Sequence, residues 1–288
     1  MRWSFLFGLI IAVASSVTVR ADEQLENLPF KFRADVVYGH KDGMALTYDV
    51  IEPKENAKGV GLMLMVSGGW VSAWMPPTAE INFVRPFLDA GYTVIAVRHG
   101  SAPRYVVPEA VADVRLALRH VSSHAESLHI DPNRIGVFGF SAGGHLSCML
   151  GTTSNDKKAG PHVAAVAAVF PPTDLEPYVK DTKLQEQFPA LKFDASKAVD
   201  SSPLRHASSD DAPTLFVHGD KDELVPLWHS EKLDAALTGV NVPSKLVVVP
   251  GAGHGFDAAG NKIMVDNMLA WFDKHLAADK PAAADAGK

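Results

Sequence analysis

The feature that most constrains this chain is the alternation of short, continuous apolar runs with longer amphipathic stretches. The apolar runs have the length of strands and are rich in branched residues, as in YTVIAVR, RIGVFGF, VAAVAAVF, TLFVHG and SKLVVVPG. Residues 108–125 lie between two such runs, and their apolar side chains recur every three or four positions, which predicts a helix. Because strands that are apolar on both faces belong to sheets covered by helices, we expect an α/β fold with about eight strands in one mostly parallel sheet.

The N-terminal residues 1–21 follow a different pattern. An arginine stands near the start, the apolar run FLFGLIIAVA follows, and VRA precedes Asp22, as is typical of a cleaved secretory signal peptide. An uncleaved anchor is the alternative, although the run is short for a membrane-spanning helix, which needs about 20 residues. We therefore expect a secreted or periplasmic protein without stable membrane insertion after cleavage. Its folded domain is expected over residues 22–277, followed by a disordered tail over 278–288.

The composition argues against several classes of protein. The formal net charge of the 288 residues is −6 and no long block of like charge occurs, so we expect no nucleic-acid-binding surface. Cys148 is the only cysteine, which excludes an intramolecular disulfide, and we expect it to be buried as a small apolar residue. Neither an HExxH motif nor a comparable cluster of ligands occurs, so we expect no metal and no cofactor.

Residues 172–210 interrupt the alternation of strands and helices. This segment is polar, contains several prolines and has no regular period. A long irregular segment within a compact domain is often an active-site lid or a binding loop, and we expect such a role here. The alternative is an ordinary surface excursion of the chain.

The sequence GFSAG, Gly139–Gly143, matches the GxSxG motif of a nucleophile elbow. Ser141 stands between a predicted strand and a predicted helix, where the turn strains the backbone and glycines allow close approach of neighbouring segments. The helix N-terminus favours negative charge that develops near the serine. One alternative is a glycine-rich turn with an incidental serine. Another is a phosphate-binding turn, but the P-loop lysine and the GxGxxG spacing are absent.

A serine hydroxyl needs a base to become a nucleophile, and the base needs a group that orients it. Asp220 and Asp222 follow the strand TLFVHG, and His254 follows the next strand in a glycine-rich loop. The carboxyl ends of parallel strands meet at one edge of the sheet, where open α/β sheets place their sites. We expect His254 to be the base and Asp222 to orient it, whereas Asp220 is expected to hold its own turn by backbone hydrogen bonds.

The other histidines are expected to be structural. His145, on the helix after the serine, is expected to pack in the core. Three more histidines lie in loops at the same edge of the sheet and are assigned no catalytic role: His99, His206 and His218.

On these residues the chain resembles the secreted α/β-hydrolases of the esterase/lipase type, in particular the bacterial feruloyl-esterase-like and hormone-sensitive-lipase-like branch. The segments MVSGGWVS, IDPNRIGVFGFSAGGHL, HGDKDELVP and PGAGHGF occur in the family's order, between about residues 60 and 256. The resemblance implies an α/β-hydrolase fold, with Ser141 as nucleophile, Asp222 as acid and His254 as base. It further implies a serine esterase that cleaves carboxylic esters through an acyl-enzyme, with acylated carbohydrates or small aryl and alkyl esters as substrates.

The segment VSGGW departs from the family's pattern. That branch usually carries an HGGG-type oxyanion motif, whereas Ser67 stands here where the histidine is expected. Trp70 and Trp74 follow this turn, and we expect them either to line the substrate pocket or to pack in the core. The backbone N–H groups that the resemblance assigns to the oxyanion hole are those of Gly68, Gly69, Trp70 and Ala142.

Three other functions are compatible with parts of this pattern. A prolyl-oligopeptidase-like exopeptidase shares the order of the triad but usually has an additional N-terminal domain, for which residues 22–60 are too few. Dienelactone-type hydrolases share the fold but use a cysteine nucleophile, whereas position 141 is serine. A non-catalytic binding module on a hydrolase fold is expected to have lost at least one triad residue, whereas all three are present in this sequence. The ester substrate and the oligomeric state stay open.

Overall fold

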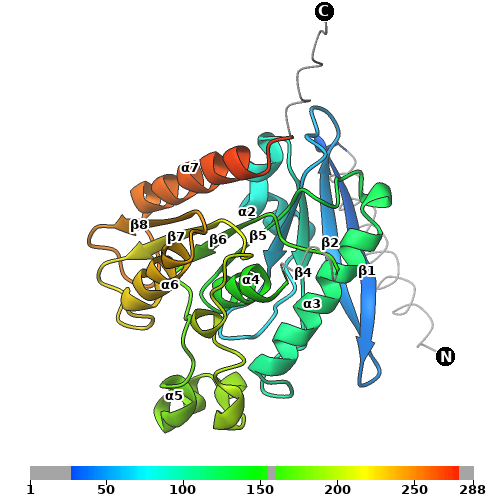
Figure 1. The fold of residues 1–288 in the computed structure, drawn as a ribbon. Helices are drawn as coiled ribbons and strands as arrows, with labels where there is room; N and C mark the ends of the chain where they lie inside the picture. Colours follow the sequence, from blue (N-terminus) through cyan, green and yellow to red (C-terminus); the bar gives the residue numbers. More distant parts are fainter. Residues whose placement is uncertain (1–26, 155–159, 279–288) are drawn as a thin grey trace, which may run out of the picture.

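The structure is a computed structural model that describes residues 27–154 and 160–278 (Figure 1). The predicted signal peptide, residues 1–21, lies outside the described residues, as do residues 279–288 of the tail predicted over 278–288. In the described part of the chain no helix has both the length and the apolar character needed to cross a membrane.

One eight-stranded sheet forms the centre of the described chain, in the order β1-β2-β4-β3-β5-β6-β7-β8. The strands are β1 (Phe30–Lys41), β2 (Met44–Pro53), β3 (Gly61–Met65), β4 (Thr93–Val97), β5 (Ile135–Phe140), β6 (Ala165–Val169), β7 (Thr214–Gly219) and β8 (Ser244–Val249). Strand β2 pairs antiparallel with both β1 and β4, and all other neighbours are parallel. The prediction of a mostly parallel sheet of about eight strands is therefore confirmed.

Helices cover both faces of this sheet (Figure 1). The long helices are α2 (Pro77–Asp89), α3 (Val107–Ser123), α4 (Ala142–Thr153), α6 (Trp228–Gly239) and α7 (Ala258–His275). Apolar residues of α3, α4 and α6 belong to one core cluster, and those of α2 and α7 belong to the other. Alternate residues of the central strand β3 enter the two clusters, Met63 on one side and Leu64 on the other, as the twofold period of a strand requires.

The starts of two helices follow from local sequence. At α3, Pro108 occupies the first turn and the Glu109 side chain accepts a hydrogen bond from the Val106 amide at 3.0 Å. At α7, the Asp257 carboxylate caps the first turn by accepting from the Gly260 amide at 2.8 Å. Both features satisfy N–H groups that a helix N-terminus leaves unpaired.

The segment after β6 contains short helices rather than one irregular loop. They are η2 (Tyr178–Lys180), α5 (Thr182–Gln187), η3 (Pro189–Leu191), η4 (Ala195–Lys197) and η5 (Pro203–Arg205), and α5 projects from the body of the molecule in Figure 1. The segment is tied to the nucleophile helix α4, because His145 Nε2 lies 2.8 Å from the Ser201 carbonyl oxygen. The remaining described element is a 3₁₀ turn, η1 (Glu126–Leu128).

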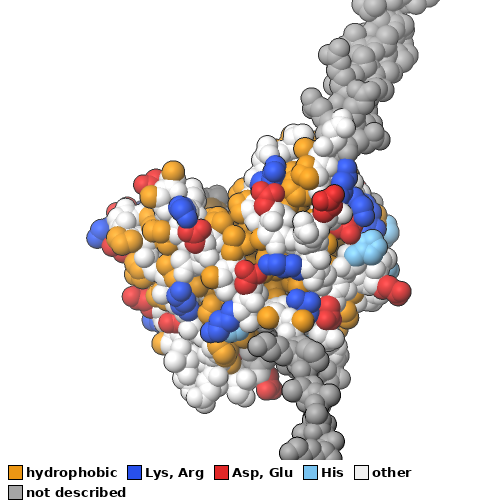
Figure 2. Space-filling model, turned by 90° about the horizontal axis from the view of Figure 1, so that it is seen from above, with side chains coloured by type: hydrophobic (Ala, Val, Ile, Leu, Met, Phe, Trp, Pro, Cys, Tyr) orange, Lys and Arg blue, Asp and Glu red, His pale blue; other side chains and the backbone are white. Residues whose placement is uncertain are grey.

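The face of the molecule seen in Figure 2 carries basic and acidic side chains interspersed with apolar ones. Charges of both signs are therefore mixed on this face, and no broad patch of one sign is seen there.

Candidate active site

Ser141 lies in a strained turn between β5 and α4. Its backbone has φ 52° and ψ −117°, a conformation that side-chain-bearing residues rarely adopt. A Cβ at Gly139 would collide with the backbone of Gly143, and a Cβ at Gly143 would collide with the carbonyl oxygen of Met65. Both glycines of the GxSxG motif are therefore needed for the close approach of β5, α4 and β3, and the turn presents Ser141 at the carboxyl edge of the sheet.

The structure brings together the three side chains expected to act as a triad. His254 Nε2 lies 2.9 Å from Ser141 Oγ, and His254 Nδ1 lies 2.7 Å from Asp222 Oδ2. A carboxylate accepts hydrogen bonds, so Nδ1 carries the proton and Nε2 is the acceptor for the serine hydroxyl. The residues come from the ends of β5, β7 and β8, the sheet edge that the sequence indicates.

Asp222 is held as a carboxylate. Burial opposes its ionisation, but hydrogen bonds from His218, His254 and the Val225 amide outweigh burial and hold the pKa of Asp222 well below its usual value. Its Oδ1 accepts from the Leu224 and Val225 amides at 3.0 and 2.9 Å. The negative charge therefore persists at neutral pH and orients the His254 ring.

Asp220 has a different position. Its Oδ1 accepts a hydrogen bond from the Gly251 amide at 2.6 Å, which ties the turn after β7 to the loop after β8. It is thus outside the hydrogen-bonded chain of Ser141, His254 and Asp222, and its contact fixes the loop that carries His254.

The VSGGW segment forms a two-residue turn beside the serine. Gly68 and Val71 exchange two backbone hydrogen bonds of 3.0 Å, and between them Gly69 and Trp70 have φ 56° and 59°. The N–H group of Gly68 is therefore used within the turn, which contradicts its assignment as an oxyanion donor. The amides of Gly69, Trp70 and Ala142 have no hydrogen-bond partner among the described residues.

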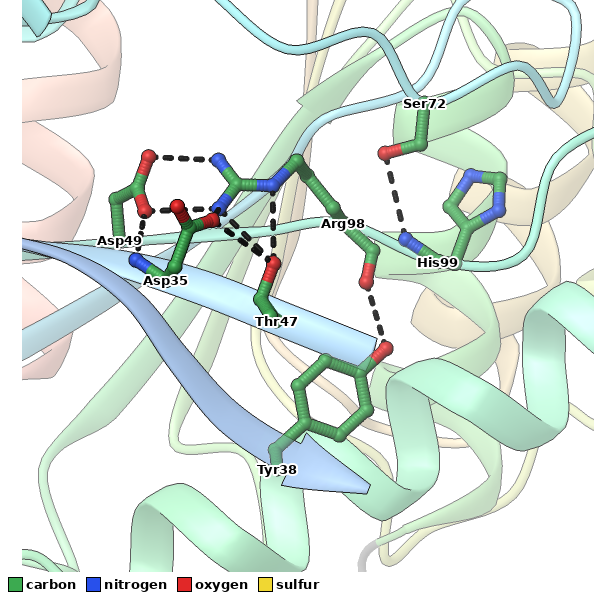
Figure 3. Close-up of polar contacts among 7 residues, drawn as sticks. All are labelled: Asp35, Tyr38, Thr47, Asp49, Ser72, Arg98 and His99. Carbon is green, nitrogen blue, oxygen red and sulfur yellow. Dashed lines mark hydrogen bonds and ion pairs between the residues drawn. The ribbon is translucent and has the colours of Figure 1, made fainter. Parts of the chain in front are cut away.

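A histidine from the neighbouring strand supports this turn. His99 Nδ1 lies 2.8 Å from the Gly100 carbonyl oxygen, so Nδ1 donates, and Nε2 then accepts from the Ser67 hydroxyl at 2.8 Å. The Ser72 hydroxyl donates to the Val66 carbonyl at 2.6 Å. The same hydroxyl oxygen accepts from the His99 amide at 3.3 Å (Figure 3). Burial lowers the pKa of His99 and keeps the ring neutral. His99 was predicted to have no catalytic role, and the absence of the usual histidine at position 67 is the signal in the sequence that could have pointed to it.

An ion-pair network holds the strand end that precedes His99 (Figure 3). Arg98 contacts both carboxylate oxygens of Asp49 at 2.6 and 2.8 Å and donates to Asp35 at 2.8 Å. The Tyr38 hydroxyl donates to the Arg98 carbonyl at 2.6 Å. A partly buried guanidinium needs such partners, and together they fix the backbone from which His99 projects.

The cavity next to the serine is small. Its volume is about 20 Å³, and Gly69, Trp70 and Ser141 form one side of it. Other lining residues come from the segment 172–210, namely Pro172, Tyr178, Leu184, Phe188 and Leu191. Trp74 does not line this cavity and is 61% exposed, so the two tryptophans have different environments.

Trp70 and His145 connect this cavity to the core. The Trp70 Nε1–H donates to His145 Nδ1 at 3.2 Å, while His145 Nε2 donates to the Ser201 carbonyl. Complete burial lowers the pKa of His145 to about 4. His145 thus packs in the core, where it links the turn at Trp70 to the segment 172–210 through Ser201. Among the described residues no group of three or more His, Cys, Asp or Glu side chains is arranged to hold a metal ion.

The sequence and the fold both have relatives among known proteins. Residues 48–237 match the family model BD-FAE. The chain is 26% identical over 258 residues to Esterase LipC of Mycobacterium tuberculosis, covering 81% of this chain and 62% of LipC. It is also 26% identical over 254 residues to an ethyl acetate hydrolase of Pseudomonas putida, covering 80% of this chain and 77% of that protein.

A solved structure with a similar fold is a truncated carbohydrate esterase from gut microbiota, with a TM-score of 0.73 and 26% identity. The match covers 86% of this chain and 97% of that one. The chain spans less than two thirds of the length of the first curated relatives it matches. Because the family model matches more than half of the chain and the fold agrees, the protein belongs to the BD-FAE family and has an α/β-hydrolase fold.

Proposed function

We propose that this protein is a serine esterase that cleaves carboxylic esters through an acyl-enzyme. The observation that carries the proposal is the continuous hydrogen-bonded chain from Asp222 through His254 to Ser141, with 2.7 and 2.9 Å between the bonded atoms. Family membership supports the same reaction, because relatives of this chain are named as esterases or as an ethyl acetate hydrolase.

In the proposed reaction His254 accepts the Ser141 proton while the serine oxygen attacks the ester carbonyl. The carbonyl oxygen becomes an oxyanion, for which the unpaired amides of Ala142, Gly69 and Trp70 are the candidate donors. The protonated His254 then gives its proton to the leaving alcohol, and a water molecule repeats the sequence on the acyl-enzyme. Asp222 keeps the imidazole in the required tautomer and stabilises its positive charge.

The small cavity beside Ser141 favours short acyl groups. A volume of about 20 Å³ accommodates a group about the size of a water molecule or a methyl group. Acetyl esters, including those of acetylated carbohydrates or of small aryl and alkyl alcohols, are therefore the proposed substrates.

The test is hydrolysis of p-nitrophenyl acetate by the purified protein and by Ser141→Ala, with Asp220→Asn as a matched variant outside the triad. We expect Ser141→Ala to lose at least 10³-fold in kcat, whereas Asp220→Asn keeps a far larger share of the activity. A fluorophosphonate probe should label Ser141. Full activity of Ser141→Ala, or failure of the probe to react, contradicts the proposal; preference for aminoacyl arylamides over esters indicates an exopeptidase instead.

We also infer that the protein is exported, because residues 1–21 have the pattern of a signal peptide. Expression of the full chain in a Gram-negative host, followed by fractionation and N-terminal sequencing, tests this. A mature protein that begins at Asp22 in the periplasm or the medium is expected. Retention in the cytoplasm with an intact N-terminus contradicts the inference.

A further inference from the structure

A second and larger cavity lies beside the triad, on the sheet face covered by α2 and α7. Its volume is about 410 Å³, within the range of about 300–1,000 Å³ typical of small-molecule sites. Ser67 and Asn261 are the lining residues with polar side chains. The wall is otherwise formed largely by aromatic and sulfur-containing side chains: Phe83, Phe140, Phe170, Phe256, Met75 and Met264.

This cavity adjoins the loop that carries His254. Gly255, the residue after His254, is part of its lining, and the Phe170 ring lies 4.5 Å from the His254 ring between centroids. Phe170 has φ 39°, a conformation rarely adopted by an aromatic residue, and its ring also contacts Phe256 at 5.4 Å. The ring of Phe140, the residue before Ser141, lies 6.3 Å from the Phe170 ring between centroids and continues the aromatic wall of the cavity.

At the outer end of this wall stands Phe83, whose ring lies 5.5 Å from that of Phe140. Phe83 is 50% exposed, so an apolar ring is presented to solvent at the end of the aromatic wall. Contact between this ring and an apolar ligand is favourable, because both apolar surfaces leave water when the ligand binds.

The chemistry of acyl transfer assigns the two cavities to the two halves of an ester. The leaving oxygen must receive its proton from His254 Nε2, so the alcohol portion lies on the histidine side. The acyl substituent then points toward the other cavity, which is lined by Ser141 and by the turn residues Gly69 and Trp70. The acyl side has about 20 Å³ and the histidine side about 410 Å³.

We propose that the cavity between α2 and α7 is the binding site for the alcohol portion of the substrate, and that it takes an aromatic or bulky alkyl group. The preferred substrates are then acetyl esters of apolar alcohols, with the bulk of the molecule on the leaving-group side. This proposal rests on the proposed esterase function.

Two isomeric esters test the assignment of the cavities. In 2-naphthylmethyl acetate the ring is on the alcohol, and in methyl 2-naphthylacetate the same ring is on the acyl group. Both leaving groups are simple alkoxides, so the comparison reports mainly on binding of the ring. We expect kcat/KM to be at least about tenfold higher for 2-naphthylmethyl acetate. Equal values, or a preference for methyl 2-naphthylacetate, overturn the proposal.

A pair of variants on α7 tests the location. Asn261 is exposed and lines the cavity, so Asn261→Trp narrows it without disturbing the core. The neighbouring Lys262 lies outside the lining, and its side chain is 75% exposed, so Lys262→Trp is the matched control. We expect Asn261→Trp to lower the kcat/KM ratio of 2-naphthylmethyl acetate to methyl acetate about tenfold, mainly through KM, and Lys262→Trp to leave this ratio unchanged.

Binding of the product alcohol gives a readout that does not depend on catalysis. Calorimetric titration of Ser141→Ala with 2-naphthylmethanol should show binding that is weakened about tenfold when Asn261→Trp is added. Absence of this weakening contradicts the subsite even if esters are hydrolysed. Absence of any Ser141-dependent ester hydrolysis, in contrast, contradicts the proposed function itself.

Discussion

The imidazole of His99 accepts a hydrogen bond from the hydroxyl of Ser67, with 2.8 Å between Nε2 and Oγ. Ser67 precedes the turn that carries the amides of Gly69 and Trp70, and its carbonyl accepts from the Gly143 amide at 3.2 Å. Ser67 thus connects the segment after β4 to the turn at Gly69 and Trp70 and to the first turn of α4. Serine stands at position 67, where the family usually has a histidine. The histidine that contacts this serine, His99, comes from the segment after the neighbouring strand.

Removal of either partner is expected to misplace the oxyanion donors. We predict that His99→Ala and Ser67→Ala each lower kcat for p-nitrophenyl acetate by about ten- to a hundredfold while KM changes less than about threefold, because the amides act mainly in the transition state. The double variant should lose no more than the more damaging single variant, since both act through one contact. Additive losses, or an effect confined to KM, contradict a positioning role; thermal unfolding of each variant shows whether the fold is retained.

A methyl group at Gly143 is expected to disrupt the elbow. Its Cβ would collide with the Met65 carbonyl, so Gly143→Ala must separate α4 from β3, and we predict a loss of about 1–3 kcal/mol or more in the free energy of unfolding. Gly239, at the end of α6, has no atom within 4 Å of the corresponding position, so Gly239→Ala is the matched control. Urea denaturation measures both. Equal stability of the two variants contradicts the steric explanation.

Buried neutral histidines are expected to make the fold sensitive to acid. Burial lowers the pKa of His145 to about 4 and that of His229 to about 3. An unfolded chain binds a proton at each histidine below about pH 6.5, whereas the folded protein does so only at the lower values. The free energy of unfolding should therefore fall as the pH drops from 6.5 toward 4.

Thermal unfolding across this pH range, with His145→Gln as the variant, tests the prediction. Glutamine has both a donor and an acceptor for the Ser201 carbonyl and the Trp70 N–H but cannot be protonated in this range. We expect Tm of the variant to decline less steeply between pH 6.5 and 4. An identical slope shows that His145 does not contribute to the acid sensitivity.

Glu80 is expected to have the opposite pH dependence. Burial and the neighbouring Asp49 carboxylate raise its pKa to about 8, and its Oε2 has no hydrogen-bond partner among the described residues. The folded protein keeps a proton at Glu80 that the unfolded chain releases near pH 4.5, so this residue lowers stability progressively as the pH rises from about 4.5 to 8.

The variant Glu80→Gln removes this titration but preserves a donor toward Asp49. We predict that its Tm, relative to that of the parent, increases as the pH rises from about 4.5 to 8. Glu55→Gln removes a carboxylate on the exposed turn after β2 and serves as the control. A Tm difference between Glu80→Gln and the parent that stays constant with pH contradicts the buried, protonated state of Glu80.

The arrangement of candidate site residues along the carboxyl edge of the sheet could be predicted from the sequence, because it depends on local signals. Continuous apolar strands, the glycines around Ser141 and the positions of Asp222 and His254 after successive strands each follow from residues close together in the chain. The boundaries were less accurate. The helix predicted over residues 108–125 is α3, Val107–Ser123, so it begins one residue and ends two residues earlier than predicted.

What the sequence by itself determined is the class of fold, the elbow and the order of the three triad residues, since strand periodicity and turn chemistry are written locally. The tertiary structure alone decided that the Gly68 amide is used within its turn, that His99 reaches Ser67, and that Trp74 is exposed whereas Trp70 borders the serine. It also decided the unequal sizes of the two cavities. These features depend on contacts between segments far apart in the chain, whose geometry is set by how strands and helices pack together rather than by any pattern along one of them.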